Sequence, residues 1–241
     1  MPNTSTSPTQ RYRPSSRVRF WRWVFQIRSF DKLLQRRAQD LFAKARLDEY
    51  LSGVKLYADI GSGSGHFSEL IARRCTHPPV RCVGVDLAWH PIERVRRRLT
   101  NHTPSRCLFT QADGTRLPLP DSCADAAGLC FVLHHIPYQL QDHILTEITR
   151  ILRPGGTLVL LEDTPAPGDA RQWKRVERWD RWQNFESRHE PHYYRSTPDW
   201  KNYLAQRDFD LVHEKFFDRM IPQMFLGAIP HTAFVFRRRK V

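Results

Sequence analysis

The chain has 241 residues, of which 40% are hydrophobic and 26% are charged, and these values exclude a largely disordered protein. No run approaches the ~18 apolar residues of a membrane span, and no apolar secretory core stands near the start, so we expect neither a spanning nor an exported protein. The formal net charge of +13 favours an anionic neighbour, such as nucleic acid, anionic lipid or an acidic substrate, without choosing among them.

The five cysteines follow no CxxC pattern, and most of them lie in apolar runs. This usage is typical of small core residues in a reducing compartment. We therefore predict a cytoplasmic protein, with peripheral attachment to a membrane left open.

The N-terminal part divides into a tail and a basic aromatic segment. Residues 1–16 are polar and contain prolines, which predicts a flexible tail. Residues 17–30 interleave four arginines with five aromatic residues and contain no acid. They favour a helix packed on the domain, and the alternatives are an anchor on an anionic membrane, an RNA-contacting arm or an organellar targeting peptide. Apolar residues at helical spacing then predict a helix over residues 31–53, which completes an N-terminal extension over residues 17–53.

From residue 54 to residue 241, strand-like and helix-like segments alternate. This order predicts βαβ units, and hence an α/β fold with a mostly parallel sheet and helices on both faces. Residues 164–198 interrupt the alternation and are predicted to form an insertion above the sheet. Residues 210–217 and 232–238 then read as an antiparallel terminal hairpin. The strands before the insertion are expected at residues 55–60, 80–86, 107–113, 125–133 and 156–163.

The stretch "YADIGSGSGHFSEL" places Gly61, Gly63 and Gly65 directly after the first predicted strand. In doubly wound sheets, such a turn lets backbone amides approach a ligand at the carboxyl ends of the strands. The dinucleotide motif G-x-G-x-x-G would need a glycine at the position of His66. Asp59 would also repel a pyrophosphate, whereas it would attract the sulfonium and ammonium groups of S-adenosylmethionine.

Two further acids end the next two predicted strands. Asp86 stands where a carboxylate can accept hydrogen bonds from both ribose hydroxyls of such a cofactor, and Asp113 where it can accept one from an adenine amino group. A single acid at a strand end is as often a turn or helix-cap residue. Three of them in register favour a binding site.

The motifs "DIGSGSG", "VGVD", "ADGTRLPLPDSCAD", "FVLHHIP" and "ILRPGGTLVLLED" resemble those of the class I S-adenosylmethionine-dependent methyltransferases. Within this class, the motifs are similar to those of the methyltransferase type 11 subgroup, which contains the ubiquinone and menaquinone C-methyltransferases. The resemblance covers residues 55–163 well and the terminal hairpin loosely. It implies a Rossmann-like seven-stranded sheet with an antiparallel last strand, a lid insertion and S-adenosylmethionine as cofactor. The cofactor-binding residues that it implies are Asp59, Gly61, Gly63 and Gly65 for the methionine part, Asp86 and Leu87 on the ribose side, Asp113 and Gly114 for the adenine, and Phe131 for the cofactor's face.

The acceptor side of the site is predicted from histidines, tyrosines and acids. His134 and His135 follow the fourth strand beside the expected methyl group, where either can act as a general base, or can pack the strand–helix junction. Further predicted substrate contacts are Glu162, His192, Tyr193 and Tyr194. Asp163, beside Glu162, can face the pocket or cap the following turn.

Two other features of the insertion do not change this interpretation. "HEPH" at residues 189–192 lacks the H-E-x-x-H spacing, so no metal site is predicted. Trp173, Trp179 and Trp182 can wall an apolar pocket or pack the core of the insertion.

The sequence therefore predicts methyl transfer to a small apolar or aromatic molecule, with oxygen, carbon and nitrogen acceptors all left open. An RNA methyltransferase is the alternative substrate class, because the chain is strongly basic. A non-catalytic cofactor-binding scaffold that recruits membrane or protein partners is the alternative of another kind.

Overall fold

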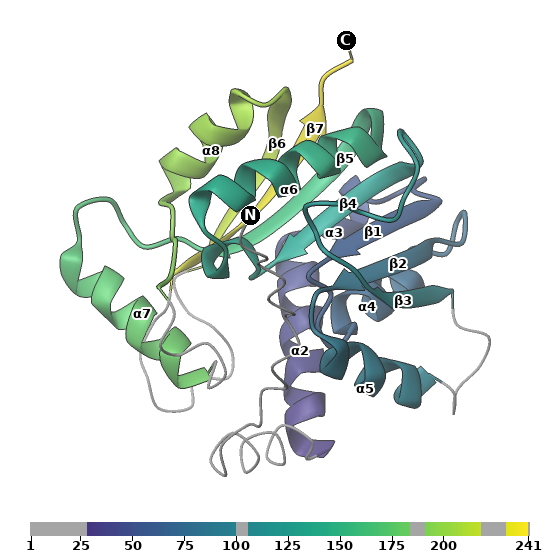
Figure 1. Cartoon of the computed structure of the whole chain (residues 1–241), viewed down its shortest axis with the longest axis horizontal. Helices are drawn as coiled ribbons and strands as arrows, with labels where there is room; N and C mark the ends of the chain where they lie inside the picture. The colour runs from purple at the N-terminus through teal and green to yellow at the C-terminus, as the bar shows by residue number, and fades with distance from the viewer. Residues whose placement is uncertain (1–27, 100–105, 184–190, 218–229, 241) are drawn as a thin grey trace, which may run out of the picture.

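The computed structural model describes residues 28–99, 106–183, 191–217 and 230–240 (Figure 1). The predicted tail and most of the basic aromatic segment at residues 17–30 lie outside this part of the chain. Within the described residues, no helix is both long enough and apolar enough to cross a membrane.

A seven-stranded sheet in the order β3-β2-β1-β4-β5-β7-β6 forms the centre of the structure. The strands from β1 to β5 pair in parallel, and β7 pairs antiparallel with both β5 and β6. The predicted α/β fold with an antiparallel terminal hairpin is therefore confirmed. The strands are β1 (Leu56–Ile60), β2 (Arg81–Asp86), β3 (Cys107–Gln111), β4 (Ala124–Cys130), β5 (Leu152–Asp163), β6 (Phe209–Phe217) and β7 (His231–Arg238).

Helices cover both faces of this sheet, as Figure 1 shows. The helices are α2 (Arg28–Lys44), α3 (Leu47–Tyr50), α4 (His66–Arg74), α5 (Trp89–Leu99), α6 (Tyr138–Ile151), α7 (Ala170–Gln183) and α8 (Thr197–Ala205). One core cluster joins the sheet to α2, α3 and α4, and a second joins it to α6 and α8. Because both faces are covered, the central strands are apolar without alternation, and β1 and β4 are almost entirely buried.

Several element boundaries differ from the sequence prediction, among them the end of β3, which is at Gln111 rather than at residue 113, so that Asp113 follows the strand instead of ending it. The helix expected over residues 31–53 is divided into α2 and α3, because Arg46 takes a left-handed conformation with φ of 52°. β5 begins at Leu152 rather than at residue 156. β4 ends at Cys130, because Phe131 also has a positive φ, of 58°, and the chain then forms a short 3-10 turn, η1 (Leu133–His135).

The predicted insertion at residues 164–198 contains α7, which stands off the sheet beyond the carboxyl end of β5 (Figure 1). Residues 191–196 return from it to the sheet and lead into α8. The start of α8 is fixed by a capping box, in which Ser196 and Asp199 satisfy each other's backbone amides. This cap holds the C-terminal end of the returning segment.

Candidate functional site

The glycine loop after β1 takes the conformation that its sequence predicts. Gly61, Gly63 and Gly65 have φ values of 71°, 50° and 72°, which side chains disfavour. A Cβ at Gly61 would lie 2.4 Å from the Val132 side chain, and one at Gly65 would lie 2.6 Å from the Phe109 side chain. The loop therefore packs tightly against these two residues. A Cβ at Gly63 would have no neighbour within 4 Å, so the loop is open to a ligand at this residue.

Asp59 lies beneath this loop at the end of β1, and only 1% of its surface is exposed. The Ser68 hydroxyl on α4 donates to its Oδ2 across 2.5 Å. Burial, with a smaller contribution from the charge of Asp86, raises the pKa of Asp59 to about 6. A buried carboxylate of this kind is stabilised when a cation binds beside it.

Asp86 ends β2 and joins the glycine loop to the next turn. Its Oδ2 accepts a hydrogen bond from the Gly63 amide at 2.8 Å, and its Oδ1 accepts one from the Ala88 amide at 2.8 Å. A carboxylate oxygen can accept more than one hydrogen bond, so both oxygens can also accept from a ligand hydroxyl. Leu87, beside it, is 71% exposed, and its carbonyl accepts from Gln111.

Asp113 and Gly114 follow β3 at the same edge of the sheet. Asp113 is exposed, and its Oδ1 accepts from the Thr115 amide at 2.8 Å. This hydrogen bond and one from the Thr115 side chain hold the pKa of Asp113 below its ordinary value. The structure thus contains the turn interaction that was the alternative interpretation of Asp113, and contact with an adenine stays a prediction.

Phe131 lies where β4 ends, next to two residues that sequence reasoning did not single out. The Arg37 guanidinium from α2 lies 4.3 Å from the centre of the Phe131 ring, and the His231 ring from β7 lies 5.7 Å from it. A positive φ at a bulky residue is a strained conformation of the kind that persists where the surroundings impose it. α2 therefore reaches the rim of the predicted cofactor site.

The turn that follows is held by Glu162, the residue before the last of β5. Glu162 is fully buried, and its Oε1 accepts from the amides of Val132 and Leu133 at 3.0 and 2.7 Å. Its Oε2 lies 2.5 Å from Nδ1 of His134, which is 2% exposed. Asp163, the next residue, is also buried.

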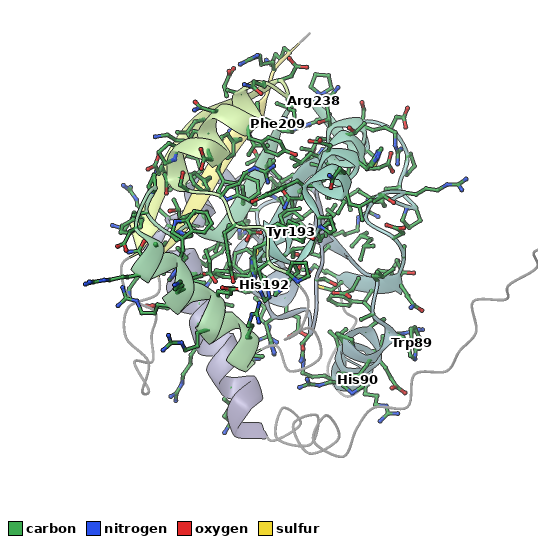
Figure 2. The ribbon with its side chains drawn as sticks, turned by 60° about the vertical axis from the view of Figure 1, so that its left-hand side comes forward. Trp89, His90, His192, Tyr193, Phe209 and Arg238 are labelled. Carbon is green, nitrogen blue, oxygen red and sulfur yellow. The ribbon has the colours of Figure 1, made fainter. Side chains whose placement is uncertain are left out.

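The returning segment 191–196 brings the predicted acceptor residues to this turn. The Tyr193 amide donates to the His134 carbonyl at 2.7 Å. The Tyr194 ring stacks on the His134 ring with centroids 5.4 Å apart, and the ring centroids of His135 and His192 are 5.3 Å apart. Figure 2 shows His192 and Tyr193 near the middle of the molecule, inward of α7, and Trp89 on α5 away from them.

The tryptophans of α7 are described only in part. The Trp173 ring meets the Tyr194 ring edge-on with centroids 6.2 Å apart, and its Nε1 donates to the Ala166 carbonyl. The side chains of Trp179 and Trp182 lie outside the described part of the structure. Trp173 therefore packs against the residues of the acceptor site.

Two further supporting residues were missed by sequence reasoning. The buried Gln141 amide on α6 donates to the carbonyls of Leu133 and Ile136 at 2.8 and 2.9 Å. The Arg195 guanidinium donates to Gln141 Oε1 and lies against three aromatic rings. No motif marks either residue.

The donor set of the site fits S-adenosylmethionine. Asp59 supplies a buried negative charge for a cation, the loop offers backbone at Gly63, and Asp86 offers two acceptors for vicinal hydroxyls. The Ser62 hydroxyl is buried in this loop and makes no hydrogen bond within the described part of the chain. The described residues contain no group of three or more His, Cys, Asp or Glu side chains arranged to hold a metal ion.

Comparisons with known proteins match part of the chain to methyltransferases. Residues 58–160 match the model of a family of methyltransferase domains. The 27-O-demethylrifamycin SV methyltransferase of Amycolatopsis mediterranei is 31% identical over 135 residues, which cover 53% of this chain and 48% of that protein. The demethylmenaquinone methyltransferase of Thermus thermophilus is 32% identical over 116 residues, which cover 48% of this chain and 50% of that protein. The chain thus spans about half the length of these curated relatives.

A solved structure shows the same fold over more of the chain. An S-adenosylmethionine-dependent methyltransferase from Methanosarcina mazei superposes with a TM-score of 0.65 at 16% identity, and the match covers 81% of this chain and 98% of that one. This likeness confirms the predicted fold, and the sequence match confirms the family resemblance of the motifs. Residues 58–160 of this chain are therefore similar to the methyltransferase domains of that family.

Proposed function

We propose that the whole chain is an S-adenosylmethionine-dependent methyltransferase that acts on a small apolar or aromatic molecule. The observation that carries this proposal is the linked pair of acids at the glycine loop: Asp59 is buried beneath it, and Asp86 is bonded to the Gly63 amide. This arrangement suits a cofactor with a cationic end and a ribose, and it is unfavourable for a pyrophosphate.

The proposed cofactor residues are those predicted from the sequence. Asp59 and the loop from Gly61 to Gly65 would hold the methionine end, and Asp86 with Leu87 the ribose. Asp113 and Gly114 would lie at the adenine, and Phe131 at the face of the cofactor. When bound, the cofactor supplies a methyl group that is already activated, so the chain has mainly to align the acceptor and exclude water.

The proposed acceptor site consists of His134, His135, His192, Tyr193 and Tyr194. The rings of the first three and of Tyr194 contact one another, so the cluster is made of aromatic and imidazole rings. Such a cluster suits a flat apolar acceptor better than an extended polyanion. The matched relatives are named for 27-O-demethylrifamycin SV and demethylmenaquinone, which supports a small-molecule acceptor. The proposal covers oxygen, carbon and nitrogen acceptors.

Calorimetric titration with S-adenosylmethionine tests the cofactor site. Asp86→Ala is expected to weaken binding at least tenfold, because two hydrogen bonds to a charged group are lost. Asp210→Ala, at an exposed acid of β6 that pairs with Arg239, is the matched control and should bind like the wild type. Equal affinity of the wild type and Asp86→Ala would contradict the ribose assignment.

Methyl transfer separates the enzyme from a binding scaffold. Incubation of the wild-type chain with 13C-methyl-labelled S-adenosylmethionine and a small-molecule extract of expressing cells should yield a labelled product. Cofactor binding with no labelled small molecule would favour the scaffold, and label in RNA would favour the RNA alternative. Contact of residues 17–30 with an anionic membrane stays a prediction, as does a cytoplasmic location.

A further inference from the structure

Two cysteines lie side by side on neighbouring parallel strands. Cys82 on β2 is the register partner of Cys107 on β3. Register partners on adjacent strands project their side chains on the same face of the sheet, with Cα atoms about 4.8 Å apart. A disulfide needs Cα atoms that are about 4.4 to 6.8 Å apart, so the backbone already has the spacing that this bond requires. Both residues are thiols in this structure.

Both thiols reach the same acceptor, which is the carbonyl oxygen of Ser68 on α4. Cys82 Sγ lies 3.3 Å from this oxygen, and Cys107 Sγ lies 3.7 Å from it. The two thiols are also within hydrogen-bonding reach of each other, and this hydrogen bond, together with burial, raises the pKa of Cys82. Because the two sulfurs share an acceptor and contact each other, they are placed to react with each other.

The two sulfurs differ in their access to solvent. Cys82 is 1% exposed, whereas Cys107 is only partly buried and lies on β3, the edge strand of the sheet. The oxidation of a cysteine depends on its exposure and on how readily its thiol ionises. Since Cys82 keeps its proton, Cys107 is the sulfur that an oxidant meets first, and Cys82 is the sulfur that can then attack it.

Ser68 connects this thiol pair to the glycine loop. Its hydroxyl donates to Asp59 across 2.5 Å, and Asp59 is the buried acid beneath the loop. The strand that carries Cys82 ends at Asp86, whose carboxylate accepts from the Gly63 amide. A change in the bonding of the two sulfurs therefore reaches both acids of the loop, one through Ser68 and the other along β2.

We propose that Cys82 and Cys107 are a redox-active pair that closes to a disulfide under a peroxide oxidant, and that closure weakens the binding of S-adenosylmethionine. The second part rests on the proposed function. The Cys107 sulfur attacks one peroxide oxygen, the O–O bond breaks, and water leaves, so that Cys107 becomes a sulfenic acid. The Cys82 sulfur then bonds to the Cys107 sulfur, the S–O bond breaks, and the hydroxyl leaves with the Cys82 proton as a second water. The pair is oxidised by two electrons, and the peroxide is reduced to water.

Closure of the bond changes the contacts of Ser68. A disulfide carries no S–H proton, so neither sulfur can donate to the Ser68 carbonyl afterwards. The first turn of α4 loses both of these interactions, and the hydroxyl that bonds to Asp59 is held less firmly. A small thiol reverses the change by thiol–disulfide exchange, which is how disulfides that form transiently in reducing compartments are opened again.

Peptide mapping of the oxidised full chain tests the bond without any cofactor. Trypsin cleaves after arginine, so it places Cys75, Cys82 and Cys107 in separate peptides, residues 75–81, 82–94 and 107–116. The reduced wild type is treated with hydrogen peroxide, and its remaining thiols are alkylated. Mass spectrometry should find the peptides of Cys82 and Cys107 joined, and dithiothreitol should separate them.

Cys75 is the internal control, because it belongs to the same buried cluster as Cys82. It should be recovered in its alkylated form. A bond from Cys75 to Cys82 overturns the proposal. So does sulfinic acid at Cys107 without a bond, or the recovery of both cysteines as alkylated thiols.

Calorimetric titration of the oxidised chain tests the effect on the cofactor. Oxidation of the wild type should weaken the binding of S-adenosylmethionine by about threefold or more, since weak hydrogen bonds one step away from the ligand are lost. Dithiothreitol should restore the affinity. The affinity of Cys107→Ala should not change on peroxide treatment, whereas Cys123→Ala, at a partly buried cysteine before β4, should respond like the wild type.

The two measurements separate this inference from the proposed function. If the joined peptides are found and the oxidised wild type binds as tightly as the reduced one, the connection through Ser68 is wrong. If the reduced wild type does not bind S-adenosylmethionine, the proposed function is wrong, and peptide mapping still decides whether the bond forms. The mapping needs only the wild-type chain, so it decides the bond even if Cys107→Ala does not fold.

Discussion

The two halves of the site are built in different ways. The cofactor half, which we define as residues 59–65 with Asp86, is joined mainly through the backbone: two loop amides donate to the Val85 carbonyl, and the Gly63 amide donates to Asp86. The acceptor half, which we define as residues 131–135 and 191–195, is joined through buried side chains from distant parts of the chain. Its main links are Glu162 to His134 and Arg195 to Gln141.

Because of this difference, the two halves place different requirements on the sequence. The cofactor half needs particular backbone conformations, which only glycine adopts at low cost. The acceptor half needs particular side chains at particular distances, and any element that reaches the site can provide them. Substitutions in the first half should therefore act through conformation and charge, and those in the second through loss of a shared network.

The largest effect is expected for Gly65→Ala in the cofactor half. A Cβ there would lie 2.6 Å from Phe109 and 2.8 Å from Val95, at a φ of 72°. Left-handed strain and overpacking together should lower the free energy of unfolding by about 4 kcal/mol. Urea denaturation measures this loss, and binding of S-adenosylmethionine should fall below detection.

Gly63→Ala is the matched control for this substitution. It carries the same strain, at a φ of 50°, but its Cβ would have no neighbour within 4 Å. The expected loss is about 1.5 kcal/mol, from strain alone. If the two variants were equally stable, the close packing of the loop at Gly65 would not matter to the fold.

The second effect concerns the charge of Asp59. Its pKa is about 6 in the folded chain against an ordinary value of 3.8, so folding favours the protonated acid. The stability that this group contributes is present below pH 3.8 and is lost as the pH rises through 6, by up to about 3 kcal/mol. Asp59→Asn should remove this pH dependence, so the stability of the variant relative to the wild type should rise by about 3 kcal/mol between pH 3.5 and pH 7.5.

The affinity for the cofactor should change with pH in the opposite direction from the stability, and through the same residue, Asp59. A cationic ligand binds the ionised acid, so the affinity of the wild type for S-adenosylmethionine should fall about tenfold from pH 7 to pH 5, as Asp59 becomes protonated. Asp59→Asn should bind weakly and without this pH dependence. Calorimetry at both pH values measures the effect, and a variant that retains the pH dependence would assign it to another group.

The difference between the cofactor half and the acceptor half also explains which features could be predicted from the sequence. The alternation of strands and helices along the chain, the glycine loop and the acids at Asp59 and Asp86 follow from periodicity and from residues at strand ends. The structure places the loop and these acids together at one edge of the sheet. The positive φ of Phe131 and the division of the helix at Arg46 could not be predicted, because residues of these types rarely take left-handed conformations. Tertiary packing imposes both.

In the acceptor half, the sequence predicted the residues but not their connections. His134, Tyr193 and Tyr194 were singled out by type and position, and the structure brings their rings and backbone together. Ser68, Gln141 and Arg195 carry no motif, since a serine, a glutamine or an arginine in a helix or loop is ordinarily a surface residue. Ser68 follows the glycine loop on the buried first turn of α4, which is the one local signal that would have identified it.

The smallest effect, at Arg195, tests whether the acceptor half depends on its network. The guanidinium carbon lies 3.8, 4.5 and 5.0 Å from the ring centres of Tyr203, Tyr138 and Trp200, and the group also donates to Gln141. Arg195→Met keeps the length of the side chain but loses these interactions, at an expected cost of about 2 kcal/mol in the free energy of unfolding.

The specific readout is amide hydrogen exchange at Tyr193, whose amide donates to the His134 carbonyl. Arg195→Met should speed this exchange at least tenfold and leave exchange at Gly63 and the affinity for S-adenosylmethionine unchanged. Arg207→Met is the matched control, because Arg207 lies over the same Tyr203 ring at 3.7 Å but belongs to the segment after α8. If Arg207→Met also speeds exchange at Tyr193, the ring cluster as a whole holds the returning segment. If neither variant does, the Tyr193–His134 hydrogen bond is maintained by the capping box at Ser196, and the acceptor half is as locally determined as the glycine loop.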